Sequence, residues 1–63
     1  MERYQQRVVD EKAALDEKLS ALLAFQKSGI FSGLDEDERL LLKAQSGCMK
    51  AYANVLAARI AKF

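Results

Sequence analysis

The chain divides into two long stretches with helical periodicity, and the second has more apolar surface than one neighbouring helix can cover. Residues 3–27 and 36–63 contain no proline, and the short segment between them holds two glycines, Gly29 and Gly33. Two helices joined by so short a connection run antiparallel. We therefore expect an all-α fold, a helical hairpin of two long antiparallel helices with a short connecting turn.

Apolar residues repeat at helical spacing in both stretches. In residues 3–27 they form one face, consisting of Val8, Leu15, Leu19 and Leu22. In residues 36–63 they form two: a first seam of Leu41, Cys48, Tyr52 and Val55, and a second seam of Leu42, Met49, Leu56, Ile60 and Phe63. Together the two seams are too broad for one contact line, so one of them needs a further partner. Gly47 lies among these residues, although glycine in a helix interior is about 1 kcal/mol less favourable than alanine. A close crossing by another helix would explain the glycine, and simple tolerance explains it equally well.

The small size of the chain favours self-association. A chain of 63 residues buries a modest fraction of its surface and usually needs disulfides, a metal or oligomerisation. Cys48 is the one cysteine and there is no histidine, so neither an internal disulfide nor a zinc site is expected. We predict one helical oligomerising domain over residues 1–63, with no cofactor and no metal, in which Cys48 is a small packing residue.

Charge and composition exclude several classes of function. A net charge of +1 argues against binding to nucleic-acid polymers, which favours a basic surplus, but leaves a small anionic ligand open. No apolar run reaches the ~20 residues that span a bilayer, and the N-terminal residues lack the apolar core of a signal peptide. We expect a soluble intracellular protein with no membrane partner. Without histidine or a Gly-rich phosphate loop, we expect no enzyme activity.

The helix ends have recognisable signals. Ser28 and Gly29 are expected to stop the first helix, because glycine can take the left-handed conformation that ends helices. Ile30 and Phe31 are then expected to fold under the hairpin and fill its closed end, where the segment could form a single helical turn. Asp35 is expected to cap the second helix, since an acidic residue follows three positions later, at the spacing of a capping box.

A first candidate site lies near the N-terminus, where Arg3, Tyr4 and Arg7 form a cluster. Tyr4 and Arg7 are three residues apart and project from one side of a helix. An aromatic face beside guanidinium groups suits a nucleobase stacked next to a phosphate. The alternative is that Tyr4 packs on a neighbouring helix and the arginines are only solvated.

Lys18 and Ser20 form a second polar pair. Lys18 lies fourteen residues after Tyr4, which is close to four whole turns, so both lie on the same side and about 21 Å apart on a straight helix. One small ligand cannot touch both there. An antiparallel pairing of two copies of the first helix, or a kink, would bring them together. The alternative is that Lys18 pairs with Glu11 or Glu17.

A third polar group, Asn54, Arg59 and Lys62, lies near the end of the second helix. Arg59 follows a surface that is mostly alanine. A cation that rises from a closely packed helix surface could point into an assembly axis. The alternative is that Arg59 complements the partial negative charge of the helix C-terminus.

Three segments carry a family resemblance. They are RYQQRVVDEKAALDEKLSALLAF, F-x-x-L-D-E-D-E-R-LLLKAQ and MKAYANVLAARIAKF, and their most specific parts are ERYQQRVVDEK and MKAYANVLAARI. Over nearly its whole length the chain resembles the small phage proteins that antagonise CBASS immunity by sequestering cyclic oligonucleotides. The resemblance implies compact helical homohexamers, built as trimers of dimers, in the cytoplasm of the infected bacterial host. It also implies cyclic dinucleotides, such as cyclic GMP–AMP, held uncleaved between two protomers, and cyclic trinucleotides near the three-fold axis.

The resemblance also implies roles for individual residues. The dinucleotide pocket would use Tyr4 to stack on a base, Lys18 and Ser20 to contact phosphate and ribose, and Arg3 and Arg7 as helpers. The trinucleotide pocket would use Arg59 and Asn54. Two alternatives stay open: a helical interaction module that binds a host or phage protein through the second seam, and a hydrolase of the same cyclic ligands.

Overall fold

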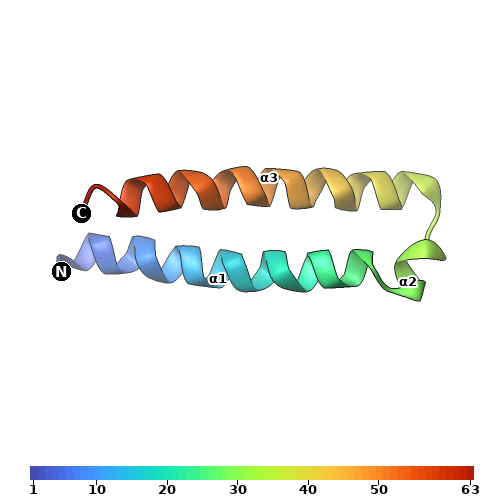
Figure 1. Ribbon diagram of the computed structural model, residues 1–63, viewed down its shortest axis with the longest axis horizontal. Helices are drawn as coiled ribbons and strands as arrows, with labels where there is room; N and C mark the ends of the chain where they lie inside the picture. Colours follow the sequence, from blue (N-terminus) through green and yellow to red (C-terminus); the bar gives the residue numbers. More distant parts are fainter.

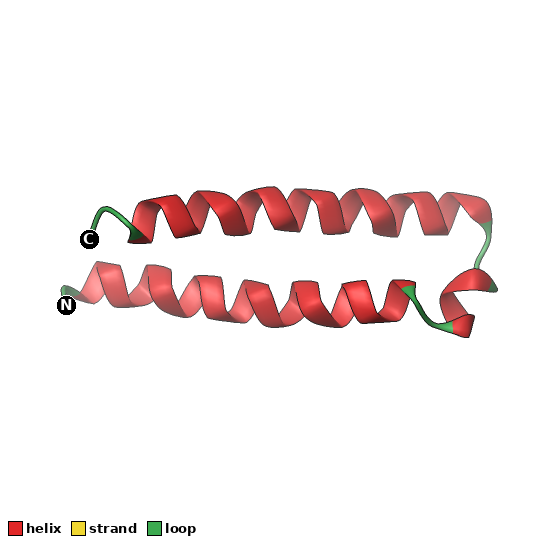
Figure 2. Ribbon diagram, viewed as in Figure 1, coloured by secondary structure: helices red, strands yellow, loops and turns green.

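The computed structural model describes residues 1–63 as a long helical hairpin (Figure 1). It contains α1 (Arg3–Gln26), α2 (Gly29–Ser32) and α3 (Glu36–Ile60), and Figure 2 shows helices and loops without a strand. The molecule measures 46 × 14 × 13 Å. α1 and α3 run antiparallel, so both termini lie at one end, the open end, and α2 lies at the other, the closed end. The predicted all-α hairpin is confirmed.

The core is a thin layer between the two long helices. Its buried apolar residues are Val8 and Leu15 from α1 and Ala53 and Leu56 from α3, with Met49 and Ile60 packed against them. Leu56 is fully buried, at 0% exposure. The second seam therefore faces α1. The interaction-module alternative was wrong in assigning a partner to the second seam, because α1 already covers it.

The first seam remains uncovered in the single chain. Leu41, Cys48, Tyr52 and Val55 are all exposed along one side of α3, and we call this surface the α3 outer face. The expectation that Cys48 is a packing residue is wrong for the single chain, because its thiol is exposed. The accessible surface of 4748 Å² exceeds the roughly 4,100 Å² expected of a compact monomer of this mass. The hairpin thus leaves unusually much surface in water.

The starts of the long helices are capped by side chains. The carboxylate of Asp35 accepts a hydrogen bond of 2.8 Å from the backbone N–H of Glu38, so the predicted cap of α3 is confirmed. Glu2 and Gln5 form a capping box at the start of α1. α1 ends at Gln26, one residue earlier than predicted, and α3 ends at Ile60, three residues earlier, because the last residues form a turn.

Ser28 separates α1 from α2. Its hydroxyl donates to the carbonyl of Phe25 at 2.7 Å and accepts from the backbone N–H of Phe31 at 3.2 Å. No glycine has a positive φ, so the predicted left-handed stop at Gly29 is wrong. Phe31 is buried and contacts Phe25 edge to face, with ring centroids 6.1 Å apart. Ile30 is 70% exposed, because two adjacent residues of one turn cannot both point inward, so only Phe31 fills the closed end as predicted.

Candidate functional site

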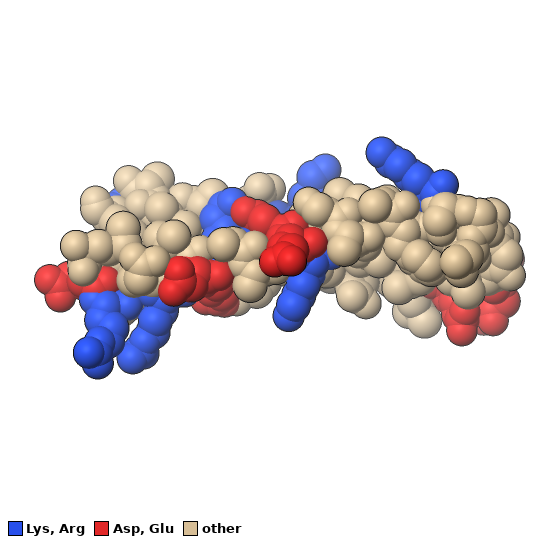
Figure 3. All heavy atoms as spheres, turned by 90° about the horizontal axis from the view of Figure 1, so that it is seen from below, with Lys and Arg blue, Asp and Glu red and all other residues tan.

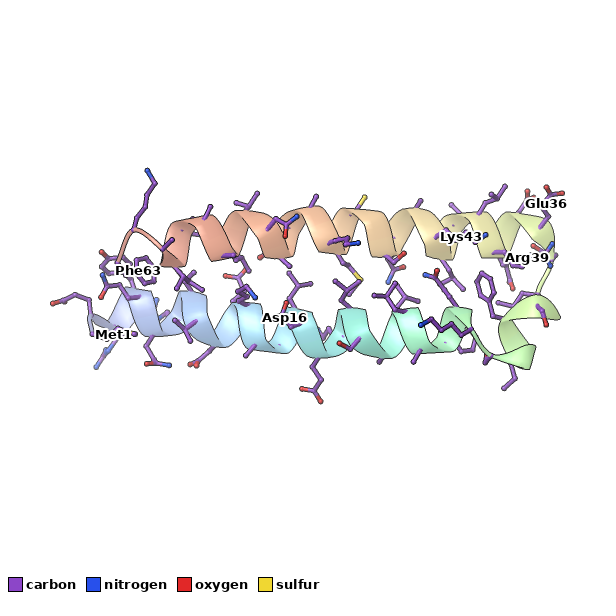
Figure 4. All side chains as sticks on the ribbon, in the orientation of Figure 1. Met1, Asp16, Glu36, Arg39, Lys43 and Phe63 are labelled. Carbon is purple, nitrogen blue, oxygen red and sulfur yellow. The ribbon has the colours of Figure 1, made fainter.

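Tyr4 lies in the first turn of α1, at the open end of the hairpin. Its ring meets that of Phe63 in a T-shaped contact, with centroids 6.0 Å apart and planes inclined by 78°. Figure 4 shows Phe63 at the same end of the molecule as Met1, whereas Glu36 and Arg39 lie at the closed end. Tyr4 nevertheless remains 59% exposed. It therefore packs on a neighbour, as the alternative interpretation expected, and still offers an aromatic surface to the solvent.

Arg3 and Arg7 flank Tyr4 and are both exposed. They lie four residues apart, so they are neighbours on the surface of α1. The one ion pair in the structure joins Lys12 to Asp16 at 2.6 Å, so neither guanidinium has a carboxylate partner. Figure 3 shows basic side chains projecting together from the open end. The structure therefore brings the predicted Arg3, Tyr4 and Arg7 cluster together as an exposed surface with two unpaired cations.

Lys18 and Ser20 are exposed in the middle of α1. α1 is one continuous helix (Figure 1), so the kink considered above is absent and Lys18 lies about 21 Å along the helix from Tyr4. Lys18 and Ser20 are two residues apart on the helix, so their side chains point about 160° apart. The single chain therefore does not bring these residues together with each other or with Tyr4. Lys18 forms no ion pair with Glu11 or Glu17.

Asn54 and Arg59 are both exposed on α3. They lie five residues apart, which separates their directions by about 140° around the helix. Arg59 is in the last turn of α3, where its charge also complements the helix C-terminus. One ligand could meet both side chains only if they came from different copies of the chain.

The surface of the single chain is open. No pocket forms in it, and no group of three or more His, Cys, Asp or Glu side chains gathers to hold a metal ion. No helix has the length and apolar character needed to cross a membrane. A ligand that is enclosed on several sides would therefore need walls from more than one copy of the chain.

The contact between Tyr4 and Phe63 was missed by the sequence analysis. Its signal lies in the lengths of the two long helices. α1 has 24 residues and α3 has 25, so a hairpin with a short connection returns the end of α3 to the start of α1. Counting residues outward from the turn would have placed an aromatic residue after α3 beside Tyr4.

The structure defines a small all-α hairpin protein whose aromatic and cationic side chains lie on an open surface. The chain belongs to the Sequestin family, whose model matches residues 2–62. This match is consistent with the sequestering anti-CBASS proteins that the sequence resembles, and the family name indicates sequestration of a ligand, a non-catalytic role. No curated protein and no solved structure matches the chain.

Proposed function

We propose that this protein sequesters cyclic oligonucleotide second messengers without cleaving them and thereby blocks CBASS antiphage signalling in the cytoplasm of an infected bacterium. Cyclic dinucleotides such as cyclic GMP–AMP occupy one kind of pocket and cyclic trinucleotides another. The observation that carries the proposal is membership of the Sequestin family over residues 2–62. A protein of this kind acts by mass action, because each bound ligand is removed from the free pool that activates the host effector.

The surface around Tyr4 supports a nucleotide as the ligand. An exposed aromatic ring can stack on any base, since every base has a π-face. The unpaired guanidinium groups of Arg3 and Arg7 lie beside it and can donate paired hydrogen bonds to a phosphate. The chemistry of a base next to a phosphate is thus matched by neighbouring residues of one helix.

The separation of Tyr4 from Lys18 supports a pocket shared by two copies. On α1 they lie about 21 Å apart but on the same side. An antiparallel pairing of two α1 helices would place Tyr4 of one copy near Lys18 of the other. A two-fold axis presents each residue twice, which suits the near two-fold symmetry of a cyclic dinucleotide. Ser20 points about 160° away from Lys18 around α1, so in this arrangement Tyr4 and Lys18 of each copy would line the shared pocket and Ser20 would face away from it.

A three-fold axis would serve a cyclic trinucleotide in the same way. Arg59 projects from the exposed surface of α3, and three copies around an axis would present three guanidinium groups to three phosphates. Asn54 lies about 140° from Arg59 around α3, so it would face away from a ligand that the three Arg59 side chains bind. A homohexamer built as a trimer of dimers has both kinds of axis, and the uncovered α3 outer face supports such an assembly.

Titration calorimetry tests the proposal with cyclic GMP–AMP and a cyclic trinucleotide as separate ligands. We expect saturable heat with each and intact ligand recovered after the complex is denatured by heat. The absence of both heat and thermal stabilisation with either ligand at high concentration would contradict the proposal. Recovery of linear products instead of the cyclic ligand would favour the hydrolase alternative.

A second candidate function is a helical interaction module that binds a host or phage protein. The observation that favours it is the α3 outer face, whose four exposed apolar residues need a partner of some kind. Light scattering separates the two candidates. A purified chain that stays monomeric and assembles only with another protein would favour the interaction module, whereas a homo-oligomer of the pure chain favours sequestration.

A further inference from the structure

The open end of the hairpin holds an aromatic pair that joins the beginning and the end of the fold. Tyr4 belongs to the first turn of α1, and Phe63 follows the end of α3. Their T-shaped contact, with centroids 6.0 Å apart and planes at 78°, is a favoured geometry for two rings. The chain thus places one residue with a proposed ligand role in contact with another that has none.

The geometry of the pair leaves Tyr4 able to stack. In a T-shaped contact, the edge of one ring meets the face of the other, so at most one face of Tyr4 is covered by Phe63. Tyr4 keeps 59% of its surface exposed and Phe63 keeps 41%. Phe63 therefore contacts the Tyr4 ring and leaves at least one of its faces uncovered by this contact.

Each partner of this contact has a further contact within its own part of the chain. The backbone N–H of Phe63 donates to the carbonyl of Ile60 at 3.0 Å, which continues the end of α3 as a turn. Gln5 contacts the Tyr4 hydroxyl through its side-chain N–H group at 3.5 Å, while its carbonyl oxygen accepts from the backbone N–H of Glu2 at 2.9 Å. Phe63 thus follows a hydrogen-bonded turn, and the tip of Tyr4 adjoins the helix cap.

We propose that Phe63 is a positioning residue, which holds the Tyr4 ring in the direction needed for stacking on a base of a cyclic dinucleotide. This inference rests on the proposed function, in which Tyr4 is the stacking residue. A side chain that is ordered before binding loses less conformational entropy when the ligand arrives. Phe63 acts through Tyr4 and itself makes no contact with the ligand.

Calorimetry of the full chain with cyclic GMP–AMP tests the role of Phe63. Phe63→Leu keeps an apolar side chain but removes the ring, and we expect binding to weaken about two- to tenfold. Phe63→Tyr keeps the ring and should restore wild-type affinity. The matched control is Phe25→Leu, which removes the equivalent aromatic pair with Phe31 at the closed end and should leave affinity within about twofold of wild type.

A double-mutant cycle distinguishes positioning from general stability. In a Tyr4→Ala background, Phe63→Leu should cause no further loss of affinity, since Phe63 acts only through the missing ring. In the Phe63→Leu variant with Tyr4 present, the ring-proton resonances of Tyr4 should lose the ring-current shift caused by Phe63. A merely structural role of Phe63 would lower the melting temperature without this dependence on Tyr4.

The outcomes separate this inference from the proposed function. If wild-type protein binds no cyclic nucleotide, the proposed function fails. If wild type binds and Tyr4→Ala weakens binding, but Phe63→Leu has no greater effect than Phe25→Leu, only the role of Phe63 is overturned. Equal losses from Phe63→Leu with and without Tyr4 would also overturn it, because Phe63 would then act on the ligand independently.

Discussion

Gln26 and Ser46 form the side-chain hydrogen bond that joins α1 to α3. Nε2 of Gln26 donates to Oγ of Ser46 at 3.0 Å and also to the backbone carbonyl of Leu42 at 3.3 Å. Ser46 is the one buried polar residue, and its hydroxyl donates onward to the carbonyl of Lys43 at 2.9 Å. These bonds add a directional contact between α1 and α3 near the closed end of the hairpin.

Replacement of Gln26 tests the importance of this network. Gln26→Leu preserves helix propensity and approximate size, but removes the donor to Ser46 and Leu42. We expect the free energy of unfolding to fall by about 1–2 kcal/mol, measured by urea denaturation at a fixed protein concentration. The matched control is Gln6→Leu, because the side chain of Gln6 bonds only to Asp10 on the exposed surface of α1. Equal losses of unfolding free energy in the two variants would show that the hydrogen bonds between the helices add nothing to the stability of the protein.

The main features of the fold could be predicted because they depend on local spacing. Leu56 and Leu41 are fifteen residues apart in the same helix, and the two-seam pattern separated a covered face from an uncovered one, although the interaction-module alternative took the covered seam to be the uncovered one. Asp35 could be predicted as the cap of α3 because aspartate is a common capping residue and an acidic residue follows it at the capping-box spacing. The closed end was harder. Ile30 and Phe31 have similar apolar character, and their spacing in the sequence does not show that Phe31 is the one that meets Phe25.

The candidate site was less predictable because its parts do not meet within one chain. Tyr4 and the two arginines are close in sequence, so their cluster follows from helix geometry. Lys18 and Arg59 lie on other parts of the surface, and in the proposed assembly their neighbours would come from other copies of the chain. The Tyr4 contact with Phe63 depends on the relative lengths of two helices, which short-range patterns do not include.

The α3 outer face should mediate self-association. We expect the mass of the wild-type protein in solution to be a multiple of 7.1 kDa, measured by light scattering. Leu41→Lys places a charge on this face and should lower the mass, because the charge would have to be desolvated at an interface. Ile30→Lys is the matched control, since Ile30 is equally exposed at 70% but lies on α2. A wild-type monomer would contradict this prediction and the shared-pocket proposal.

Substitutions at the proposed site should separate the two kinds of ligand. Tyr4→Ala should weaken cyclic dinucleotide binding by about 1–3 kcal/mol, the usual contribution of base stacking on an aromatic residue, while Tyr4→Phe should retain it. Lys18→Ala should weaken binding of the same ligand by about 1.5–3 kcal/mol through loss of a charge-assisted hydrogen bond. Lys27→Ala, which removes an exposed lysine after α1, serves as the control in calorimetry.

Arg59→Ala should weaken the binding of cyclic trinucleotides and leave the binding of dinucleotides nearly unaffected, because the proposed pockets for the two ligands lie on different symmetry axes. Lys50→Ala removes another exposed cation of α3 and controls for the change in net charge. Binding is measured by calorimetry and mass by light scattering in parallel. If the Arg59→Ala variant lost binding of both ligands while its mass in solution stayed unchanged, the prediction of two separate pockets would be contradicted.

Gly47 offers a test of whether another helix crosses α3 closely. Gly47 has an ordinary negative φ within α3, and a Cβ added there would meet nothing within 4 Å in the single chain. Gly47→Ala should therefore stabilise the protein by about 1 kcal/mol, which raises the melting temperature of a domain this small by roughly 4–8 °C. Ala51→Gly, at an exposed position of the same helix, should lower it by a similar amount. A lower melting temperature for Gly47→Ala, together with a smaller mass in solution, would mean that a helix of another copy packs against Gly47 and that the new methyl group pushes it away.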